Sequence, residues 1–222
     1  MSIDKTQKIA NNFDDFSEVF SRWSPSEGFR AIFKETVFQI IENECKTMKV
    51  LRILDVGCGH GTWISYLLKN ATSPSDLRIR GIDLSEKRIL LAKQTLSEYS
   101  TVSVEVMDFK EMTSKEKYDI VFFSEVIQYM GEYIYHDLFQ KCREILAEGG
   151  YLVIIDKEKY SFTAFNGRIL QILGEVGVVS KIYRYISYPS FRRLSNNSEK
   201  NGFQVAKRLT RKNFSALVLR KI

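Results

Sequence analysis

The stretch that decides the fold is ILDVGCGHGTW, residues 53–63, in which three glycines alternate behind an apolar run that closes on an acid. The apolar run is typical of a buried strand, and residues 62–70, TWISYLLKN, have the pattern of a helix opening. A strand that ends at Asp55 or Val56 places the glycines at the carboxyl edge of a sheet, where open α/β folds bind ligands. Because glycine permits positive φ and carries no Cβ, the motif predicts a ligand that touches the main chain. A tight turn without a ligand is the alternative.

Composition favours one globular domain over a disordered or fibrous chain. The 222 residues are 44% hydrophobic and 13% aromatic, without repeats or Pro/Gly-rich linkers. The first residues, MSIDKTQKIANNFDDF, are charged throughout, and no later run is long enough to span a bilayer. We therefore expect a cytoplasmic protein without a membrane span. The three scattered cysteines indicate neither a disulfide framework nor a zinc site, and no metal is expected.

The net charge of +6 raises the question of a nucleic-acid partner. The basic residues are dispersed, except for a C-terminal bias in FRRL, AKRLTRK and LRKI. This scatter favours a solvated basic face over a nucleic-acid footprint.

Strand-like and helix-like segments alternate along most of the chain, which predicts a parallel sheet covered by helices on both faces. Ser85 and Glu86 suit a helix start, whereas Gly149 and Gly150 suit a helix stop after Ala147. The last two strands are joined by a turn too short for a crossover, so they must pair antiparallel. The expected strands are 50–56, 77–83, 101–107, 118–124, 151–156, 202–209 and 213–222. One helix is expected to begin near Phe29, and the other expected helices cover 62–70, 85–99, 133–150 and 190–201.

The glycine spacing narrows the ligand. A dinucleotide fingerprint would need a third glycine at position 62, which is Thr62, whereas the third glycine is Gly61. The resulting pattern, D-x-G-x-G-x-G, resembles the first motif of the class I S-adenosylmethionine-dependent methyltransferases. Further segments resemble later motifs of that family: GIDLS, VEVMDF, YDIVFFSEVIQYM, LAEGGYLVIID and the terminal hairpin of GFQVAKRL and NFSALVLRKI. The resemblance covers about residues 50–156 and 190–222.

The resemblance implies a doubly wound α/β fold with a seven-stranded, mostly parallel sheet in the order 3-2-1-4-5-7-6, whose last strand is antiparallel. It also implies that residues 1–222 form one methyltransferase domain. Residues 1–28 would fold over the cofactor as a lid, and residues 157–189 would be an insertion on the substrate side.

The resemblance also implies S-adenosylmethionine as the cofactor, and it assigns contacts to it. Gly57, Gly59 and Gly61 would hold the methionine end together with Asp55. Asp83 would take the ribose hydroxyls and Asp108 the adenine amino group. Cys58, Leu84, Phe109 and Ser124 complete the expected cofactor contacts. Taken singly, Asp55 could cap the glycine turn, Asp83 could start a helix and Asp108 could be a solvent-facing loop residue.

Three residues near the fourth motif are candidates for catalysis: Glu125, Tyr129 and His136. A base is optional, because positioning of the nucleophile can supply most of the catalysis. Many relatives have Glu-His where this chain has Gln128 and Tyr129, which puts a histidine base in doubt. A helix-start acid at Glu125 and an exposed structural His136 are the alternatives. His60 is either a solvent-exposed loop residue or a residue over the cofactor. Tyr129 with Trp23 or Trp63 could shape an aromatic wall, although core packing is the commoner role of aromatic residues in such a chain.

The expected activity is methyl transfer to O or N of a small-molecule acceptor. The insertion combines aromatic and basic residues, which suits an apolar or phosphate-bearing acceptor, although packing of an amphipathic helix pair is equally compatible. The alternatives are an RNA or protein methyltransferase, a non-catalytic binding protein with the cofactor fold and a nicotinamide oxidoreductase. The residues concerned are Tyr160, Phe162, Phe165, Tyr183, Tyr185, Tyr188, Phe191, Arg168, Lys181, Arg184, Arg192 and Arg193.

Overall fold

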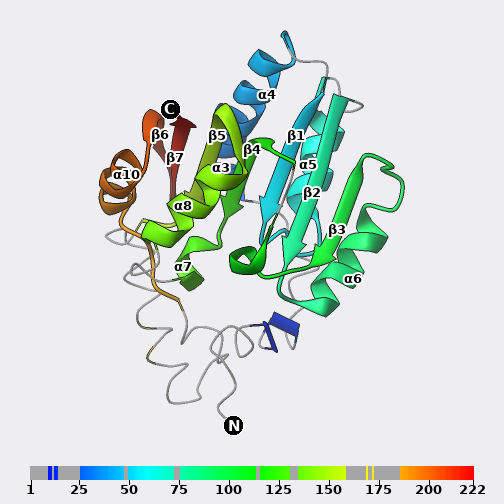
Figure 1. The fold of residues 1–222 in the computed structure, drawn as a ribbon. Helices are drawn as coiled ribbons and strands as arrows, with labels where there is room; N and C mark the ends of the chain where they lie inside the picture. Colours follow the sequence, from blue (N-terminus) through cyan, green and yellow to red (C-terminus); the bar gives the residue numbers. More distant parts are fainter. Residues whose placement is uncertain are drawn as a thin grey trace.

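The structure of the chain, a computed structural model, describes residues 10–11, 13–14, 26–47, 50–72, 76–113, 116–130, 135–158, 169, 172 and 186–222. Its centre is a seven-stranded sheet in the order β3-β2-β1-β4-β5-β7-β6, as predicted (Figure 1). Strands β1 to β5 pair in parallel, and β7 pairs antiparallel with both β5 and β6. The strands are β1 (Leu51–Val56), β2 (Leu77–Asp83), β3 (Val102–Val106), β4 (Tyr118–Ser124), β5 (Leu146–Asp156), β6 (Phe203–Arg211) and β7 (Phe214–Lys221).

Helices cover both faces of the sheet, so the fold has three layers and two apolar cores (Figure 1). One core is formed with helices that precede and follow β1 and β2, and the other lies under the helices that follow β4 and β5. The first face carries α3 (Glu27–Phe33), the π-helical η1 (Lys34–Phe38), α4 (Gln39–Glu44), α5 (Thr62–Asn70) and α6 (Glu86–Thr95), and the second carries α7 (Ile127–Met130), α8 (Tyr135–Ile145) and α10 (Phe191–Lys200).

Local signals explain where several helices begin. The Ser85 side chain accepts a hydrogen bond from the backbone N–H of Arg88 at 3.1 Å, which caps α6 where the sequence predicted its start. Ser190 caps α10 in the same way through the backbone N–H of Arg193. Strand β1 is buried at every position except Arg52, because it lies in the middle of the sheet and both of its faces are covered.

The predicted helix stop at Gly149 and Gly150 is wrong. Helix α8 ends at Ile145, and both glycines lie inside β5. They form a bulge, because the β4–β5 pairing passes from Tyr118 opposite Leu146 to Ile120 opposite Tyr151. Gly149 has φ 73, and a Cβ on Gly150 would lie 3.0 Å from the Ala147 carbonyl oxygen, so the bulge requires glycine at both positions.

The prediction of Trp63 as part of an aromatic wall at the site is also wrong. Its ring stacks on Phe29 at a centroid distance of 4.0 Å and on Phe33 at 4.9 Å, inside the first core. The pattern of apolar residues could not distinguish a role in the core from a role at the site, since both place an aromatic residue at the start of α5.

Several expectations lie outside the described residues. They concern most of the lid segment 1–28, including Trp23, and most of the insertion 157–189, including the aromatic and basic residues between 160 and 185. In the part of the chain that is described, no helix has the length and apolar character needed to cross a membrane.

Candidate functional site

The glycine loop joins β1 to α5 at the carboxyl edge of the sheet. Gly57, Gly59 and Gly61 all have positive φ, between 56° and 77°. A Cβ on Gly57 would lie 2.4 Å from Cγ2 of Val126, and one on Gly61 would lie 2.5 Å from Cδ1 of Leu96. A Cβ on Gly59 would meet only the Arg88 guanidinium, at 3.8 Å. Gly57 and Gly61 are therefore needed for the packing of the loop itself, and Gly59 leaves room for a ligand.

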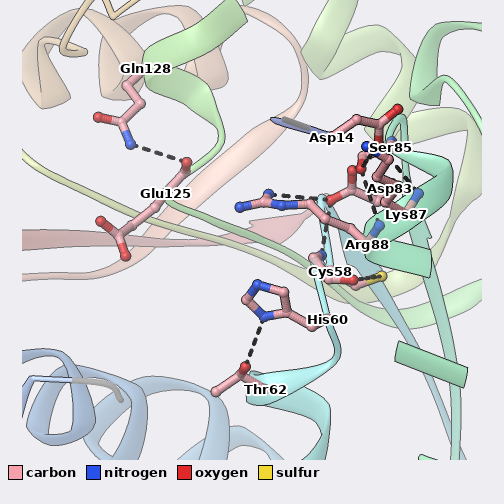
Figure 2. Close-up of polar contacts among 11 residues, drawn as sticks. Asp14, Cys58, His60, Thr62, Asp83, Ser85, Lys87, Arg88, Glu125 and Gln128 are labelled. Carbon is pink, nitrogen blue, oxygen red and sulfur yellow. Dashed lines mark hydrogen bonds and ion pairs between the residues drawn. The ribbon is translucent and has the colours of Figure 1, made fainter. Parts of the chain in front are cut away.

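Asp83, at the end of β2, holds this loop in place. Its Oδ2 accepts a hydrogen bond from the backbone N–H of Gly59 at 2.9 Å, and its Oδ1 accepts one from the backbone N–H of Ser85 at the same distance (Figure 2). The guanidinium of Arg88 lies 3.9 Å from Oδ2. An ionised carboxylate has about four acceptor sites, so these contacts leave capacity for ligand hydroxyls. The carboxylate thus organises the loop and is also placed to bind a ligand.

Asp55 is fully buried near the end of β1. Neither of its carboxylate oxygens has a hydrogen-bond partner among the described residues. Burial raises the pKa of Asp55 well above its usual value, and the nearby charge of Asp83 raises it further. An unpaired buried carboxyl group is costly and marks a place where a cationic group would be bound.

Two further loop residues are shielded from solvent. Cys58 is buried, and burial raises the pKa of its thiol well above the usual value. The prediction of His60 as a solvent-exposed loop residue is wrong, since only 9% of the residue is exposed. Burial and the charge of Arg88 lower the pKa of His60 to about 4, so the imidazole is neutral at neutral pH. Its Nδ1 lies 3.3 Å from the Thr62 hydroxyl (Figure 2).

Arg88 was not identified from the sequence, yet it connects several parts of the site. Its side chain extends from α6 past Asp83 in the direction of Glu125 (Figure 2). The guanidinium lies 4.1 Å from the ring centroid of Phe13, whose ring contacts that of Tyr129 at 5.0 Å, edge to face. Asp14 beside it accepts hydrogen bonds from the Ser85 hydroxyl and from the backbone N–H of Lys87. A described part of the N-terminal segment therefore lies against the site.

The residues after β3 have mainly local roles. Asp108 caps the short 3₁₀ helix η3 (Phe109–Glu111), because its Oδ1 accepts from the backbone N–H of Lys110 at 2.9 Å. The Phe109 ring is buried and meets Phe123 edge to face at 5.2 Å. Leu84 is half-buried directly after β2. The bond from the Lys110 N–H uses one acceptor site of the Asp108 carboxyl group, so the group can accept further hydrogen bonds.

The ends of β4 and β5 carry a second polar cluster. Ser124 ends β4 with a buried hydroxyl that has no partner among the described residues. Glu125 follows with φ 56, and its carboxylate lies 3.1 Å from Nζ of Lys157. The fully buried Asp156 ends β5 and accepts from the backbone N–H groups of Gln128 and Lys157. Burial and the charge of Glu125 raise the pKa of Asp156 to about 7.

The three catalytic candidates do not meet at one point. Tyr129 is half-buried beside Glu125, and burial together with that carboxylate raises the pKa of its phenol, which therefore stays protonated. His136 is exposed near the start of α8 and makes no hydrogen bond or ion pair with any residue that the structure describes. Glu125 remains the candidate whose side chain borders the site.

Sequence reasoning missed Arg88, Asp156 and Lys157. The signal for Asp156 was present, because it ends a strand as Asp83 does. Arg88 lies in the first turn of α6, and its side chain extends toward the Asp83 carboxylate, which residue spacing alone does not show.

The described residues fit a cationic nucleoside such as S-adenosylmethionine. Asp55 offers a buried carboxyl group without a hydrogen-bond partner among the described residues, a Cβ on Gly59 would meet nothing closer than the Arg88 guanidinium at 3.8 Å, and Asp83 retains acceptor capacity beyond its bond from the Gly59 N–H. These groups lie at the carboxyl ends of β1 and β2, at the edge where open α/β sheets bind nucleosides.

Comparisons with known proteins agree with this geometry. Residues 53–150 match the family described as "Methyltransferase domain". The ubiquinone biosynthesis O-methyltransferase of Leptothrix cholodnii is 26% identical over 159 residues, which cover 66% of this chain and 63% of that protein. The demethylmenaquinone methyltransferase of Lactococcus lactis is 25% identical over 169 residues, covering 69% and 66%. The chain thus spans somewhat less than two thirds of the length of the first of these relatives.

Solved structures share the fold over nearly the whole chain. The magnesium protoporphyrin IX methyltransferase of Synechocystis PCC 6803, solved with bound SAH, superposes with a TM-score of 0.74 at 14% identity, covering 99% of this chain and 100% of that one. The N-methyltransferase NodS of Bradyrhizobium japonicum gives 0.67 at 15% identity, covering 99% of each chain. Residues 53–150 thus match a methyltransferase domain, and the fold over nearly the whole chain is similar to that of methyltransferases solved with bound SAH.

Proposed function

We propose that the protein is an enzyme that transfers a methyl group from S-adenosylmethionine to O or N of a small-molecule acceptor. The observation that carries the proposal is the fully buried carboxyl group of Asp55, which has no hydrogen-bond partner among the described residues and lies on the strand that leads into the glycine loop. When bound, the cofactor supplies an activated methyl group on a positively charged sulfur. The chain supplies binding, orientation and a route for a proton.

The cofactor side would be formed by the ends of β1, β2 and β3. Asp55 would pair with the positively charged amino group, Gly59 would allow close approach of the main chain and Asp83 would accept from the ribose hydroxyls. Asp108 would accept from the adenine amino group, for which its carboxylate has capacity beyond the Lys110 contact. Gly57, Gly61, Cys58, Leu84, Phe109 and Ser124 would shape the surrounding wall.

The acceptor side would be formed by the ends of β4 and β5. Glu125 is the residue best placed to receive a proton from an acceptor, since its carboxylate is half-buried at the end of β4 and contacts Nζ of Lys157 at 3.1 Å. Tyr129 would form a wall or donate a hydrogen bond, because its raised pKa keeps it from acting as a base. The exposed position of His136 favours a structural role.

A small molecule is favoured over RNA or protein as the acceptor. The relatives named above act on ubiquinone and menaquinone precursors by their names, and the structural neighbour by its name acts on a porphyrin. Basic residues of the C-terminal part are engaged in ion pairs, including Arg211 with Glu35 and Arg208 with Glu158. This local neutralisation argues against a continuous surface for nucleic acid. An apolar or phosphate-bearing acceptor and a location in the cytoplasm belong to the same proposal.

The decisive experiment incubates purified protein with methyl-labelled S-adenosylmethionine and separate pools of small metabolites, RNA and protein. Label recovered in a small molecule, with formation of the demethylated cofactor, is expected. Label in RNA or protein would favour the alternative acceptors. Cofactor binding without transfer to any pool would favour a non-catalytic binding protein, and failure to bind the cofactor at all would contradict the proposal.

We also propose that residues 1–222 act as one domain in which the N-terminal segment covers the cofactor. Phe13 and Asp14 support this role, because they contact Arg88, Tyr129 and the start of α6. Cation–π contacts contribute about 0.5–2 kcal/mol, so Phe13→Ala should speed cofactor dissociation by roughly 2- to 30-fold. Stopped-flow measurement would test this, and an unchanged dissociation rate would contradict the covering role.

A further inference from the structure

The pair formed by Glu125 and Lys157 bridges the ends of two neighbouring strands. Glu125 follows the last residue of β4, and Lys157 follows the last residue of β5. Their side chains are joined at 3.1 Å, and each remains partly accessible, at 21% for Glu125 and 25% for Lys157. In a partly exposed ion pair of this kind, a ligand can replace one of the two partners at a lower desolvation cost than in a fully buried pair.

The backbone at Glu125 is held in an unfavourable conformation. Its φ is 56, and one other non-glycine residue of the described chain has a positive φ: Lys212, with φ 52, in the tight turn between β6 and β7. The Glu125 N–H donates to the Ile155 carbonyl at 2.8 Å, and its carbonyl accepts from Nε2 of Gln128 at 3.1 Å (Figure 2). Left-handed conformations of this kind cost about 1–3 kcal/mol and gather at functional sites.

This strained segment lies against the glycine loop. Val126, the next residue, packs so closely over Gly57 that a Cβ there would approach its Cγ2 to 2.4 Å. The buried hydroxyl of Ser124 precedes the pair. The Glu125–Lys157 pair therefore lies at the ends of β4 and β5, next to the glycine loop where the cofactor is proposed to bind.

Lys157 carries a persistent positive charge. Burial alone would lower its pKa, but Glu125, Tyr188 and Asp156 together raise it above the usual value. Its Nζ also lies 5.6 Å from the ring centroid of Phe214. Among the described residues, Asp156 from β5 and Tyr188 from the segment before α10 act electrostatically on Lys157, and Tyr129 from α7 is subject to the charge of Glu125.

We propose that Lys157 binds an acidic oxygen of the acceptor and stabilises it as the anion, and that Glu125 receives the proton of that oxygen, so that the enzyme selects acidic oxygen acceptors over amines. This inference rests on the proposed methyl transfer and specifies its acceptor. An anionic oxygen is attracted by the ammonium group of Lys157, and its charge disappears when it is methylated. Methylation of an amine would instead create or retain positive charge beside that ammonium group.

The balance of the step is simple. The acceptor O–H gives its proton to the Glu125 carboxylate, and the oxygen, stabilised by Lys157, forms the new O–CH₃ bond. The S–CH₃ bond breaks with its electron pair going to sulfur, and the proton passes from Glu125 to water. An acceptor that already is a carboxylate omits the proton transfer and keeps the contact with Lys157.

The test measures the pKa of a bound probe, without turnover, in protein saturated with the demethylated cofactor. The probes are para-nitrophenol and related nitrophenols, whose phenolate absorbance reports ionisation. Wild-type protein should lower the probe pKa by about one to three units, as a nearby opposite charge does. Lys157→Met should abolish the shift, Lys157→Arg should retain most of it and Glu125→Gln should lower the probe pKa further, because a competing negative charge is lost.

The matched control is Lys207→Met, which removes the same charge from β6, where Lys207 donates to the Glu35 carbonyl and the Gln39 side chain. This control should leave the probe pKa unchanged. With methylatable phenols, Lys157→Met should reduce kcat/KM by about 10²- to 10³-fold, the usual cost of losing an oxyanion donor. Circular dichroism and cofactor calorimetry would verify that each variant is folded and loaded.

The outcomes separate this inference from the proposed function. Wild-type protein that binds no cofactor contradicts the proposed function itself. Cofactor-loaded wild-type protein that leaves the pKa of every probe unchanged overturns the inference, as does a Lys157→Met variant with the wild-type shift. Preferential methylation of amines across a panel of phenols, carboxylic acids and amines also overturns it.

Discussion

Gly57 and Gly59 have similar left-handed backbone angles but different surroundings. We therefore expect a substitution at Gly57 to lower mainly the stability of the fold and one at Gly59 to lower mainly cofactor affinity. An alanine at either position incurs about 1–2 kcal/mol of backbone strain. Gly57→Ala also forces a Cβ against Val126, whose branched side chain adjusts poorly, and overpacking adds about 1–3 kcal/mol. Compared with Gly57→Ala, the Gly59→Ala variant should be more stable against unfolding but should lose more cofactor affinity. Thermal denaturation and calorimetry of both variants would check this difference.

The double variant Gly57→Ala/Val126→Ala supplies the control. It should recover part of the stability that Gly57→Ala loses, because the clash is removed while the strain remains. Equal stability and equal affinity in the two single variants would contradict the assignment of Gly59 to the ligand.

Asp55 should couple cofactor binding to proton release. Because burial and Asp83 raise its pKa, the free protein holds a proton there over a wider pH range than an exposed aspartate does. A bound cation favours the ionised form, so binding expels that proton and tightens as pH rises. Asp55→Asn should weaken binding by about 1.5–3 kcal/mol and abolish the release. Calorimetry in buffers of different ionisation enthalpy measures the released protons, and equal release by the variant would contradict this role.

At the scale of elements, Asp156 ties the end of β5 to the start of α7 through its bond from the Gln128 N–H at 3.0 Å. Its pKa of about 7 lies above the value near 4 of an unfolded aspartate. The native state therefore holds the extra proton between these values, and the contribution of Asp156 to stability falls as pH rises from about 4 to about 7, by up to about 1.4 kcal/mol per pH unit. Asp156→Asn should reduce the dependence of the free energy of unfolding on pH between about 4 and about 7.

Urea denaturation across that range would measure the slope. Asp137→Asn, on the exposed side of α8, removes an equal charge and should leave the slope unchanged. An Asp156→Asn profile parallel to that of the wild type would contradict the assignment.

The sequence was most informative where a buried strand runs directly into a turn. Residues 77–83 and 118–124 were predicted with the bounds of β2 and β4, because apolar residues alternate with arginines up to Gly81 in the first segment and the second is largely apolar. The α8–β5 junction was wrong, since glycine signals both a helix end and a bulge, and only the pairing with β4 distinguishes them. Asp55, Gly59 and Asp83 could be expected at one edge of the sheet because the ends of neighbouring parallel strands converge there, whereas Arg88 and Lys157 come near that edge through side-chain length.

At the scale of the whole molecule, the site is assembled from strand ends that lie far apart in the sequence, so a ligand that bridges them should stabilise the entire fold. S-adenosylmethionine at about one hundred times its dissociation constant adds about 2.7 kcal/mol. For a domain of this size, that corresponds to a rise in Tm of roughly 5–11 °C. NAD should produce no comparable shift, because the loop lacks the third glycine of the dinucleotide fingerprint. Differential scanning calorimetry with each ligand tests this, and a larger shift with NAD would favour a nicotinamide oxidoreductase instead.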